Sequence, residues 1–465
     1  MKTTLSKLLQ ASERFRFVLP RGWILIVGLL GALVTLPGQT NGVSAFTDFL
    51  IEAVGINRDQ LSLAYLLGTL SSAAILPHAG KLYDRWGSRR TGSLAAAGLG
   101  LSLIGLVQLP RIIAAAGSWG LSESASALVS FWLGFFLIRF FGQGMLMLVS
   151  RNMVLKWFDD RRGFAVALLG IGIPLGFSAA PTLLNQLIEG VGWQGAWLGL
   201  GVLLFPLFAC IALVTFSDPP DADVPQGEAM PRLYTRNTTP IPYFLRPIAY
   251  VLRGWGLKRT REPMRPVEDV TLHEARRGLS FWVFIGITTL SSLLTTGFTF
   301  HVVAVMGQSG VGRTQALAIF LPIAVIQIGV QTVSSFGSDF VKLKYLAIVH
   351  AGALAMMLVS LELLNLTPSA YWLVVLFLGI SLGLFGVDSA VVWPRFYGLK
   401  HLGSISGFAN AWIVAGSALG PYAFSLAERL TGSFYTILYI LGPMAFILML
   451  LGFWAESPAR TDAGL

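Results

Sequence analysis

The residues of this sequence best suited to chemistry are ionisable side chains placed inside apolar stretches. Arg139 and Asp388 each lie within such a stretch, and His301 lies near the end of another. A charged side chain in hydrocarbon is costly unless it faces water or a partner, so each of the three is a candidate for function. A guanidinium can bind an anion through paired hydrogen bonds. A buried carboxylate or imidazole can instead carry a proton.

Each of these residues also has a structural interpretation. Arg139 would then bond helix carbonyl groups, Asp388 would be an interfacial charge near a helix end, and His301 would be a packing histidine. Five amide side chains leave a similar choice open, because they could hydrogen-bond a substrate or hold helices together. They are Gln39, Asn41, Gln143, Gln327 and Gln331.

A second group of residues, at positions 80–90, lies between two apolar stretches and has residue types that suit a conformational latch. Its glycines permit a tight turn, and Asp84 can accept charge-assisted hydrogen bonds from arginine or from a helix N-terminus. We expect the group to hold two parts of the molecule together in one state and to release them in another. The alternative is that its basic residues only fix topology. The predicted latch residues are Gly80, Asp84, Arg85, Gly87 and Arg89, with Asp339 in a degenerate copy later in the chain.

The sequence lacks the motifs of enzymes and of nucleotide or metal sites. Its Gly-x-Gly patterns lie in apolar stretches rather than after a strand, and it has no P-loop. Its five histidines are scattered and its one cysteine is Cys210, so no His-x-x-x-His or multi-cysteine site is present. We therefore expect no enzyme activity, no cofactor and no bound metal.

Composition identifies the elements that must position these residues. The chain has 465 residues, of which 54% are apolar and 12% are charged, and its mean hydropathy is +0.70. Soluble domains carry about 25% charged residues, so we predict an all-α polytopic membrane protein. A helix needs about 20 apolar residues to cross the ~30 Å hydrocarbon layer. Twelve stretches qualify: 22–46, 60–79, 90–109, 126–149, 163–188, 195–216, 279–306, 314–336, 345–364, 370–393, 404–427 and 434–455.

Basic residues indicate how these twelve helices are oriented. With both termini in the cytoplasm, 28 Lys and Arg residues fall in inside segments and four fall in outside loops, namely Arg58, Arg111, Arg313 and Arg429. Such an excess marks the cytoplasmic face. The pI near 9.9 then reflects topology, and no nucleic-acid partner is expected. The predicted units are a cytoplasmic N-terminus (1–21), a six-helix bundle (22–216), a cytoplasmic linker (217–278), a second six-helix bundle (279–455) and a cytoplasmic tail (456–465).

The two halves also match each other at an offset of 240 residues. In the first half the matching residues are Gly163, Gly176 and Pro181, and in the second half they are Gly403, Gly416 and Pro421. With the division of the stretches six and six, this match predicts two parallel repeats around a cavity near the bilayer midplane.

Two motifs resemble those of the major facilitator superfamily. Gly80-Lys-Leu-Tyr-Asp84-Arg85-Trp-Gly87-Ser-Arg89-Arg90 resembles the superfamily's G-x-L-x-D-R-x-G-R-[KR] loop, with Ser88 before Arg89. Arg139-Phe-Phe-Gly142-Gln143-Gly144 is similar to its Arg-x-x-x-Gly-x-Gly pattern and is one residue short. The resemblance implies the major facilitator fold of twelve helices in two six-helix repeats.

Two further runs look like the monocarboxylate and oxalate–formate porter branch of that superfamily. They are the run from Trp157 to Gly163 and the run from Trp393 to Gly407. This resemblance implies small organic anions that move with a proton or by exchange. A polar run in the first apolar stretch, Pro37-Gly-Gln39-Thr40-Asn41-Gly42, indicates an unwound segment of the helix.

We therefore expect a secondary active transporter that rocks two halves about a central site. Its expected partners are a small, anionic substrate, a proton or counter-substrate, and the lipid bilayer. It is expected to act as a monomer in the plasma (inner) membrane. Two alternatives stay open: an exporter of drugs or neutral solutes with the same fold, and a membrane sensor that transports nothing.

Overall fold

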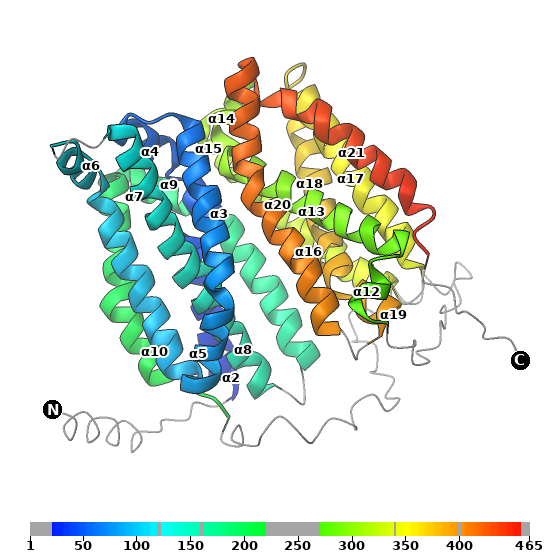
Figure 1. The fold of residues 1–465 in the computed structure, drawn as a ribbon, viewed down its shortest axis with the longest axis horizontal. Coiled ribbons are helices and arrows are strands. Elements are labelled where there is room, and N and C mark those ends of the chain that lie inside the picture. Colours follow the sequence, from blue (N-terminus) through cyan, green and yellow to red (C-terminus); the bar gives the residue numbers. More distant parts are fainter. Residues whose placement is uncertain are drawn as a thin grey trace, which may run out of the picture.

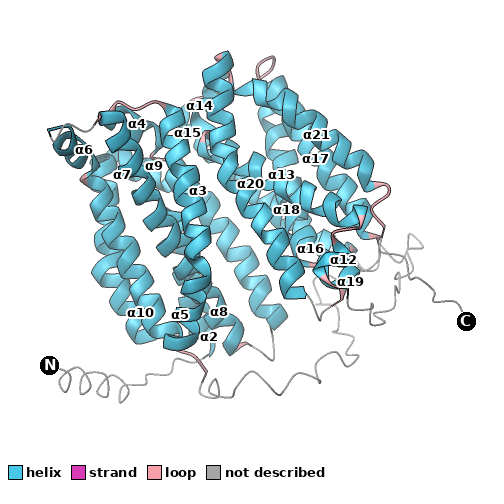
Figure 2. Cartoon of the chain, viewed as in Figure 1, coloured by secondary structure: helices cyan, strands magenta, loops and turns pink. Residues whose placement is uncertain are grey.

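The structure, a computed structural model, describes residues 21–118, 122–158, 162–219, 270–338, 341–398 and 402–456. All regular elements in these ranges are helices (Figure 2). Residues 1–20, most of the predicted linker 217–278, the tail beyond Glu456 and the predicted latch residue Asp339 lie outside the described residues.

The helices form two groups that lie side by side (Figure 1). The first group consists of α2 (Arg21–Leu33), η1 (Leu36–Gly38), α3 (Thr40–Ser44), α4 (Thr47–Val54), α5 (Arg58–Val107), α6 (Leu109–Ser118), α7 (Glu123–Ile138), η2 (Arg139–Leu146), α8 (Met147–Trp157), α9 (Arg162–Val202), η4 (Leu203–Phe208) and α10 (Ala209–Thr215). The second consists of α12 (Leu272–Ala275), α13 (Leu279–Phe300), α14 (Val302–Gln308), α15 (Arg313–Ala318), α16 (Phe320–Gly337), α17 (Leu343–Leu364), α18 (Ala370–Ala390), α19 (Val392–Tyr397), α20 (Leu402–Thr431), η6 (Phe434–Ile437) and α21 (Leu438–Gly452).

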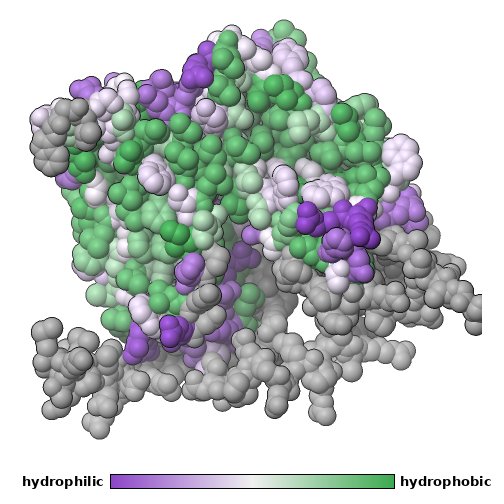
Figure 3. Space-filling view, viewed as in Figure 1, coloured by the Kyte–Doolittle hydropathy of each residue, from purple (hydrophilic) through white to green (hydrophobic). Residues whose placement is uncertain are grey.

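Within the described ranges, eight helices are long and apolar enough to cross a membrane. They are Arg85–Val107, Glu123–Trp157, Leu168–Thr215, Leu279–Phe300, Arg313–Ser335, Leu343–Leu364, Ala370–Ser389 and Phe434–Gly452, and a shorter apolar helix covers Gly22–Gly38. Hydrophobic residues cover the middle of the visible face, while hydrophilic ones gather toward its upper and lower margins (Figure 3). This pattern suits a protein surrounded by lipid. The count of twelve spans and the side on which each terminus lies stay predictions.

Two of the long helices contain a break at a glycine. The bounds of α5 include the predicted loop 80–90, where Gly87 has φ 70° and ψ −179°. Gly192 breaks α9 in the same way, with φ 73° and ψ 164°. A positive φ is open to glycine at little cost, so at each position one helix ends and the next begins without a separate loop.

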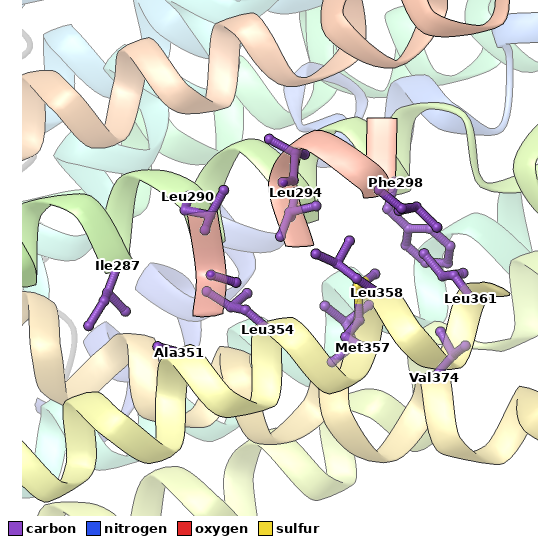
Figure 4. Close-up of a cluster of buried hydrophobic side chains, with 14 of the residues drawn as sticks. Ile287, Leu290, Leu294, Phe298, Ala351, Leu354, Met357, Leu358, Leu361 and Val374 are labelled. Atoms are coloured by element: carbon purple, nitrogen blue, oxygen red, sulfur yellow. The ribbon is translucent and has the colours of Figure 1, made fainter. Parts of the chain in front are cut away.

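Each group of helices has its own hydrophobic core. One core is built from buried residues between Ile24 and Phe216, with Phe300 added from the other group. The second is built from buried residues between Ala275 and Ala455. Figure 4 shows its centre, where Leu290 and Leu294 of α13 face Ala351 and Leu354 of α17.

Glycines allow corresponding helices of the two groups to cross closely. A Cβ on Gly176 of α9 would lie 2.2 Å from Leu33 Cδ2 of α2, and a Cβ on Gly416 of α20 would lie 2.5 Å from the Thr289 carbonyl oxygen of α13. These two glycines are partners in the predicted 240-residue offset. Small residues let helix backbones approach each other, and Gly416 meets the backbone of α13 in this way, whereas Gly176 makes room for the Leu33 side chain.

Candidate functional site

The first apolar helix is interrupted where the sequence predicts an unwound segment. After α2 the chain forms the short helix η1, then Gln39 is extended (φ −93°, ψ 156°), and α3 begins at Thr40. A Cβ on Gly42 would lie 2.1 Å from the Leu36 carbonyl oxygen, so the turn closes because residue 42 has no side chain. The predicted break is confirmed.

This break packs directly against the helix that carries Arg139. A Cβ on Gly38 would lie 2.3 Å from the Ile138 carbonyl oxygen, and one on Gly142 would lie 3.1 Å from Gly38 Cα. Here η2 takes a π-helical turn from Arg139 to Leu146, a local widening that is frequent at functional sites. The two glycines therefore bring backbone against backbone and place Arg139 beside the broken helix.

Arg139 is buried, with 2% of its surface exposed. Its Nη1 donates to the Gly38 carbonyl at 3.3 Å and to Thr40 Oγ1 at 3.5 Å, and its guanidinium lies 5.2 Å from the centre of the Tyr65 ring. Its Nε has no hydrogen-bond partner, and no carboxylate of the described residues pairs with it. The described contacts of the Arg139 guanidinium are thus all with uncharged groups: a carbonyl, a hydroxyl and an aromatic ring.

Tyr65 connects Arg139 to the second group of helices. Its hydroxyl is 2.8 Å from Thr40 Oγ1, and its ring centre lies 4.6 Å from that of Phe300. The next residue, His301, is buried, and its Nε2 lies 2.9 Å from the Pro421 carbonyl and 3.3 Å from Ser62 Oγ of the first group. Arg139 and His301 therefore lie on either side of one aromatic contact between the groups.

Polar contacts between the groups gather at the upper end in Figure 1, which we name the Arg313 end. Arg313 of α15 donates to Asp48 Oδ2 at 3.0 Å, to Asn185 Oδ1 at 2.8 Å and to the Ala45 carbonyl at 2.6 Å. Two further ion pairs lie there, Arg58–Asp48 at 2.9 Å within the first group and Arg429–Asp59 at 2.9 Å between the groups. The two groups are joined at this end.

The opposite end, which we name the Asp218 end, has a polar cluster inside the first group. Asp218 accepts from the Ser88 backbone N–H at 2.6 Å and from Ser88 Oγ at 2.8 Å, and it pairs with Lys156 Nζ at 3.3 Å. A Cβ on Gly87 would lie 2.7 Å from Asp218 Oδ2. Burial raises the pKa of the neighbouring Tyr83 hydroxyl. Asp218 thus binds the start of the predicted linker to the loop at 80–90.

The predicted latch residues are placed only in part. The side chain of Asp84 lies outside the described part of the chain, as does Asp339. Arg85 is exposed, and Arg89 Nε donates to the Phe216 carbonyl at 3.2 Å. In this conformation the described contacts of Gly87, Ser88 and Arg89 stay within the first group, and the latch role stays a prediction.

Asp388 shares no described hydrogen-bond partner with Arg139 or His301. It is fully buried in α18, and its Oδ2 is 2.7 Å from His350 Nδ1 of α17. Two of the predicted amide residues, Gln39 and Asn41, lie in the broken segment beside Arg139. Gln39 Nε2 bonds Thr35 Oγ1 at 3.0 Å, and Asn41 Nδ2 bonds the Phe177 carbonyl at 3.2 Å. The remaining amides are the exposed Gln143 of η2 and the half-buried Gln327 and Gln331 of α16.

Sequence reasoning did not assign a site role to several residues that the structure puts at these contacts. Tyr65, His350 and Asp48 carry no local signal, because their partners lie far along the chain. The sequence analysis places Arg313 only among the outside charges, and Asp218 lies within the predicted linker 217–278 without a role of its own. Both residues are charged, but the sequence does not show which residue each of them pairs with.

Comparison with known proteins gives a family for the chain. The family model of the Major Facilitator Superfamily matches residues 27–421. A mutant of the nucleoside transporter NupG has a similar crystal structure, with a TM-score of 0.65 and 8% identity over 93% of this chain and 99% of that one. A D-xylose-proton symporter structure gives 0.62 and 16% identity, over 93% and 97%. At such low sequence identity, these two structural similarities concern the fold alone.

Sequence relatives match over shorter lengths. An "Uncharacterized 38 kDa protein in 23S RNA operon" of Thermoproteus tenax is 26% identical over 221 residues, which is 45% of this chain and 48% of that protein. "Monocarboxylate transporter 9" of Mus musculus is 28% identical over 114 residues, which is 24% of this chain and 22% of that protein. The chain thus spans about half the length of the first relative and about a fifth of the second. Because the family model covers most of the sequence and the helices are apolar enough to cross a membrane, the chain belongs to the Major Facilitator Superfamily, a family of transporters, and is an integral multi-pass membrane protein.

Proposed function

We propose that this chain is a secondary active transporter of a small organic anion and that Arg139 binds the carboxylate of that anion. The observation that carries the proposal is the uncompensated charge of Arg139. Its guanidinium is buried against a carbonyl, a hydroxyl and an aromatic ring, with its Nε unpartnered. A guanidinium binds a carboxylate through two parallel hydrogen bonds, so an anionic ligand would supply the missing counter-charge.

The contacts between the groups support alternating access. If the predicted topology holds, the Arg313 end faces outward from the plasma (inner) membrane, and this conformation is closed to the outside. The positions of Arg58, Arg313 and Arg429 at one end agree with that topology, because all three were predicted to lie outside. Rocking of the two groups would then separate Arg313 from Asp48 and bring the loop at 80–90 against the other group as a latch.

The anionic substrate is supported by a partial relative as well as by Arg139. The relative named Monocarboxylate transporter 9 shares 28% identity with a quarter of this chain. Coupling would be to a proton or to a counter-substrate. The rival substrates are drugs or neutral solutes, and the rival function is sensing without transport.

Uptake into proteoliposomes tests the proposal. The purified protein would be offered radiolabelled acetate, lactate and oxalate, and also xylose and uridine as neutral solutes, with and without a pH gradient or an internal counter-anion. We expect carboxylate uptake that Arg139→Gln abolishes and Arg139→Lys retains in part, since lysine keeps the charge and loses the planar fork. Removing one partner of a buried charged contact weakens binding by about 2–5 kcal/mol. Arg111→Gln is the matched control, because Arg111 is exposed and bonds only the neighbouring Gln108 among the described residues.

Three outcomes contradict the proposal in different ways. Uptake of a neutral solute that Arg139→Gln does not change would favour the neutral-solute reading. Carboxylate uptake that survives Arg139→Gln would remove the arginine from the site. No uptake or exchange of any probe by correctly folded protein would favour a sensor.

A further inference from the structure

A fully buried acid–base pair lies in the second group of helices, outside the candidate anion site. His350 of α17 and Asp388 of α18 both have 0% side-chain exposure, and His350 Nδ1 lies 2.7 Å from Asp388 Oδ2. The second carboxylate oxygen, Oδ1, has no hydrogen-bond partner among the described residues. Such a pair is expensive to bury unless all of its bonding capacity is used, and here one oxygen of the carboxylate is left open.

Two serine hydroxyls extend the pair toward α13. His350 Nε2 lies 3.2 Å from Ser381 Oγ, and Ser381 Oγ lies 3.2 Å from Ser291 Oγ on α13. A hydroxyl can donate and accept at the same time, so this row of groups can reverse the direction of its hydrogen bonds. The row therefore responds to the presence or absence of a proton on Nε2.

Helix α13 also takes part in joining the two groups of helices. It ends at Phe300, whose ring contacts Tyr65 of the first group, and His301 follows at the contact with Ser62. Leu290 and Leu294 of α13 face Ala351 and Leu354 of α17 in the hydrophobic core (Figure 4). Ser291 and His350 of the polar row are the sequence neighbours of Leu290 and Ala351. A change at the pair can thus reach the contact between the groups through one rigid helix.

The helices packed around the pair carry few other charges. Neither α13 nor α16 contains an ionisable residue, and α21 contains only Tyr439. The charges on the remaining neighbours sit near helix ends: Lys344, which pairs with Glu456; Glu362, which accepts from Tyr439; Arg395, which bonds the Ser338 carbonyl; and Glu428 and Arg429 at the end of α20. The charge of the pair is therefore set chiefly by its own protons.

The pair has two charge states that differ by one proton. With protons on both ring nitrogens, the imidazolium and the Asp388 carboxylate are neutral in sum, and Nε2–H donates to Ser381. When Nε2 loses its proton, the pair carries one negative charge, and the Ser381 hydroxyl turns to donate to Nε2. A net charge in a low-dielectric interior is strongly disfavoured, so occupancy of this proton is linked to how the surrounding helices pack.

We propose that the His350–Asp388 pair is a proton-binding site whose occupancy shifts the balance between the two arrangements of the helix groups. This inference rests on the proposed function, because the proton bound here would be the one that couples transport. The row from Asp388 through His350 and Ser381 to Ser291 then links proton binding to α13 and to the joined Arg313 end.

Titration of His350 in the folded protein tests the site without a substrate. The chain has five histidines, so ring ¹⁵N signals from histidine-labelled protein in liposomes can be assigned with single His→Gln variants. We expect the His350 ring signals to change with pH in the wild-type protein, over the range in which the protein stays folded. His350 ring signals that stay constant over that range would overturn the proposal. This test needs no variants other than those used to assign the signals.

A second measurement links the site to conformation. In a Cys210→Ser background, Thr47→Cys places a thiol at a buried contact between the groups, where Thr47 Oγ1 lies 3.5 Å from the Phe300 carbonyl. Because the thiolate is the form that reacts, the labelling rate by a maleimide is divided at each pH by the rate of the same cysteine in the unfolded protein, and we expect this ratio to change about tenfold with pH. The double variant His350→Gln/Asp388→Asn, which keeps polar groups of similar shape, should fold normally and lose this pH dependence. His78→Gln, at an exposed position of α5, should keep it.

The outcomes separate this inference from the proposed function. Unchanged pH dependence in the folded double variant would overturn the proton site even if carboxylate uptake is found. Protein that moves no carboxylate and yet loses its pH-dependent labelling in the double variant would contradict the proposed anion transport and leave the proton site in place. If the double variant does not fold, the titration of His350 in the wild-type protein decides alone.

Discussion

Arg313 and Asp48 belong to different groups of helices, and their side chains form an ion pair of 3.0 Å. Asp48 also pairs with Arg58 of its own group, so one carboxylate is held between two arginines. Arg313 completes its bonding with Asn185 and the Ala45 carbonyl. A single side chain of the second group thus takes three partners in the first at the Arg313 end.

Replacing Arg313 by glutamine should open this end. The variant loses a partly exposed ion pair and at least one charged hydrogen bond, together about 1–3 kcal/mol, and glutamine can restore only part of the bonding. We expect the Thr47→Cys thiol in the Cys210→Ser background to react with maleimide at least several-fold faster. The labelling rate at constant pH is the measurement.

Arg111→Gln provides the control for that experiment, because it also removes one predicted outside arginine. Arg111 bonds Gln108 three residues away, so its loss should leave the labelling rate unchanged. Equal rates in the Arg313 variant and the wild-type protein would mean that apolar packing alone joins the two groups.

Much of the fold could be predicted because it depends on composition. Apolar length and the low charged fraction predict membrane helices, and the Pro-Gly-polar run at 37–42 predicts the break in the first one. The family match supports the predicted class. The joints between helices were harder to predict from the sequence. The predicted loop at 80–90 lies within the bounds of α5, because one glycine with positive φ is enough to end one helix and start the next.

The candidate site could be predicted only where a charged residue lies within an apolar stretch of the sequence. Arg139 and Asp388 stood out as charges in apolar stretches, and both are buried. Their partners did not stand out, because a helix contact depends on packing between segments that are far apart in sequence. His350 pairs with a carboxylate 38 residues away, and Asp218 reaches Ser88 across 130 residues.

Gly38→Ala should strongly destabilise the protein. The added methyl group would lie 2.3 Å from the Ile138 carbonyl oxygen, so the broken first helix and η2 would have to separate. Overpacking of this kind costs about 1–3 kcal/mol. We expect a clear fall in the thermal midpoint of tryptophan fluorescence and loss of the Arg139 contact with the Gly38 carbonyl.

Gly190→Ala is the matched control for the close approach at Gly38. Its added Cβ would have nothing within 4 Å, so the same substitution should leave the thermal midpoint unchanged or slightly raised. If both variants unfold at the wild-type temperature, the backbone contact at Gly38 is looser than the structure has it.

Asp218→Asn should loosen the cluster at the opposite end. The amide keeps the size of the side chain and loses the charge that pairs with Lys156, and its NH₂ group cannot accept from Ser88. Hydrogen bonds to a charged group contribute about 1.5–3 kcal/mol. We expect a lower thermal midpoint and faster cleavage by protease near the start of the linker. Glu52→Gln, at an exposed position, should behave as wild type, and a stable Asp218→Asn variant would mean that the cluster contributes little.

Tyr65 separates two effects that act on Arg139. Tyr65→Phe keeps the ring against Arg139 and Phe300 and removes only the hydrogen bond to Thr40. That loss is worth about 0.5–1.5 kcal/mol, so any carboxylate found to be transported should bind roughly 2- to 12-fold more weakly, with little change in the thermal midpoint.

Tyr65→Leu should be far more damaging, because it also removes the ring. The cation–π contact with a buried arginine is worth about 2 kcal/mol, and a truncated buried aromatic leaves a cavity beside Phe300. We expect weaker anion binding, a lower thermal midpoint and faster labelling of Thr47→Cys in the same variant. Tyr345→Phe, at an exposed tyrosine of α17, controls for loss of a hydroxyl. If Tyr65→Phe is as damaging as Tyr65→Leu, the hydroxyl rather than the ring orients Arg139, and the bond between Tyr65 and Thr40 becomes the feature that positions the anion site.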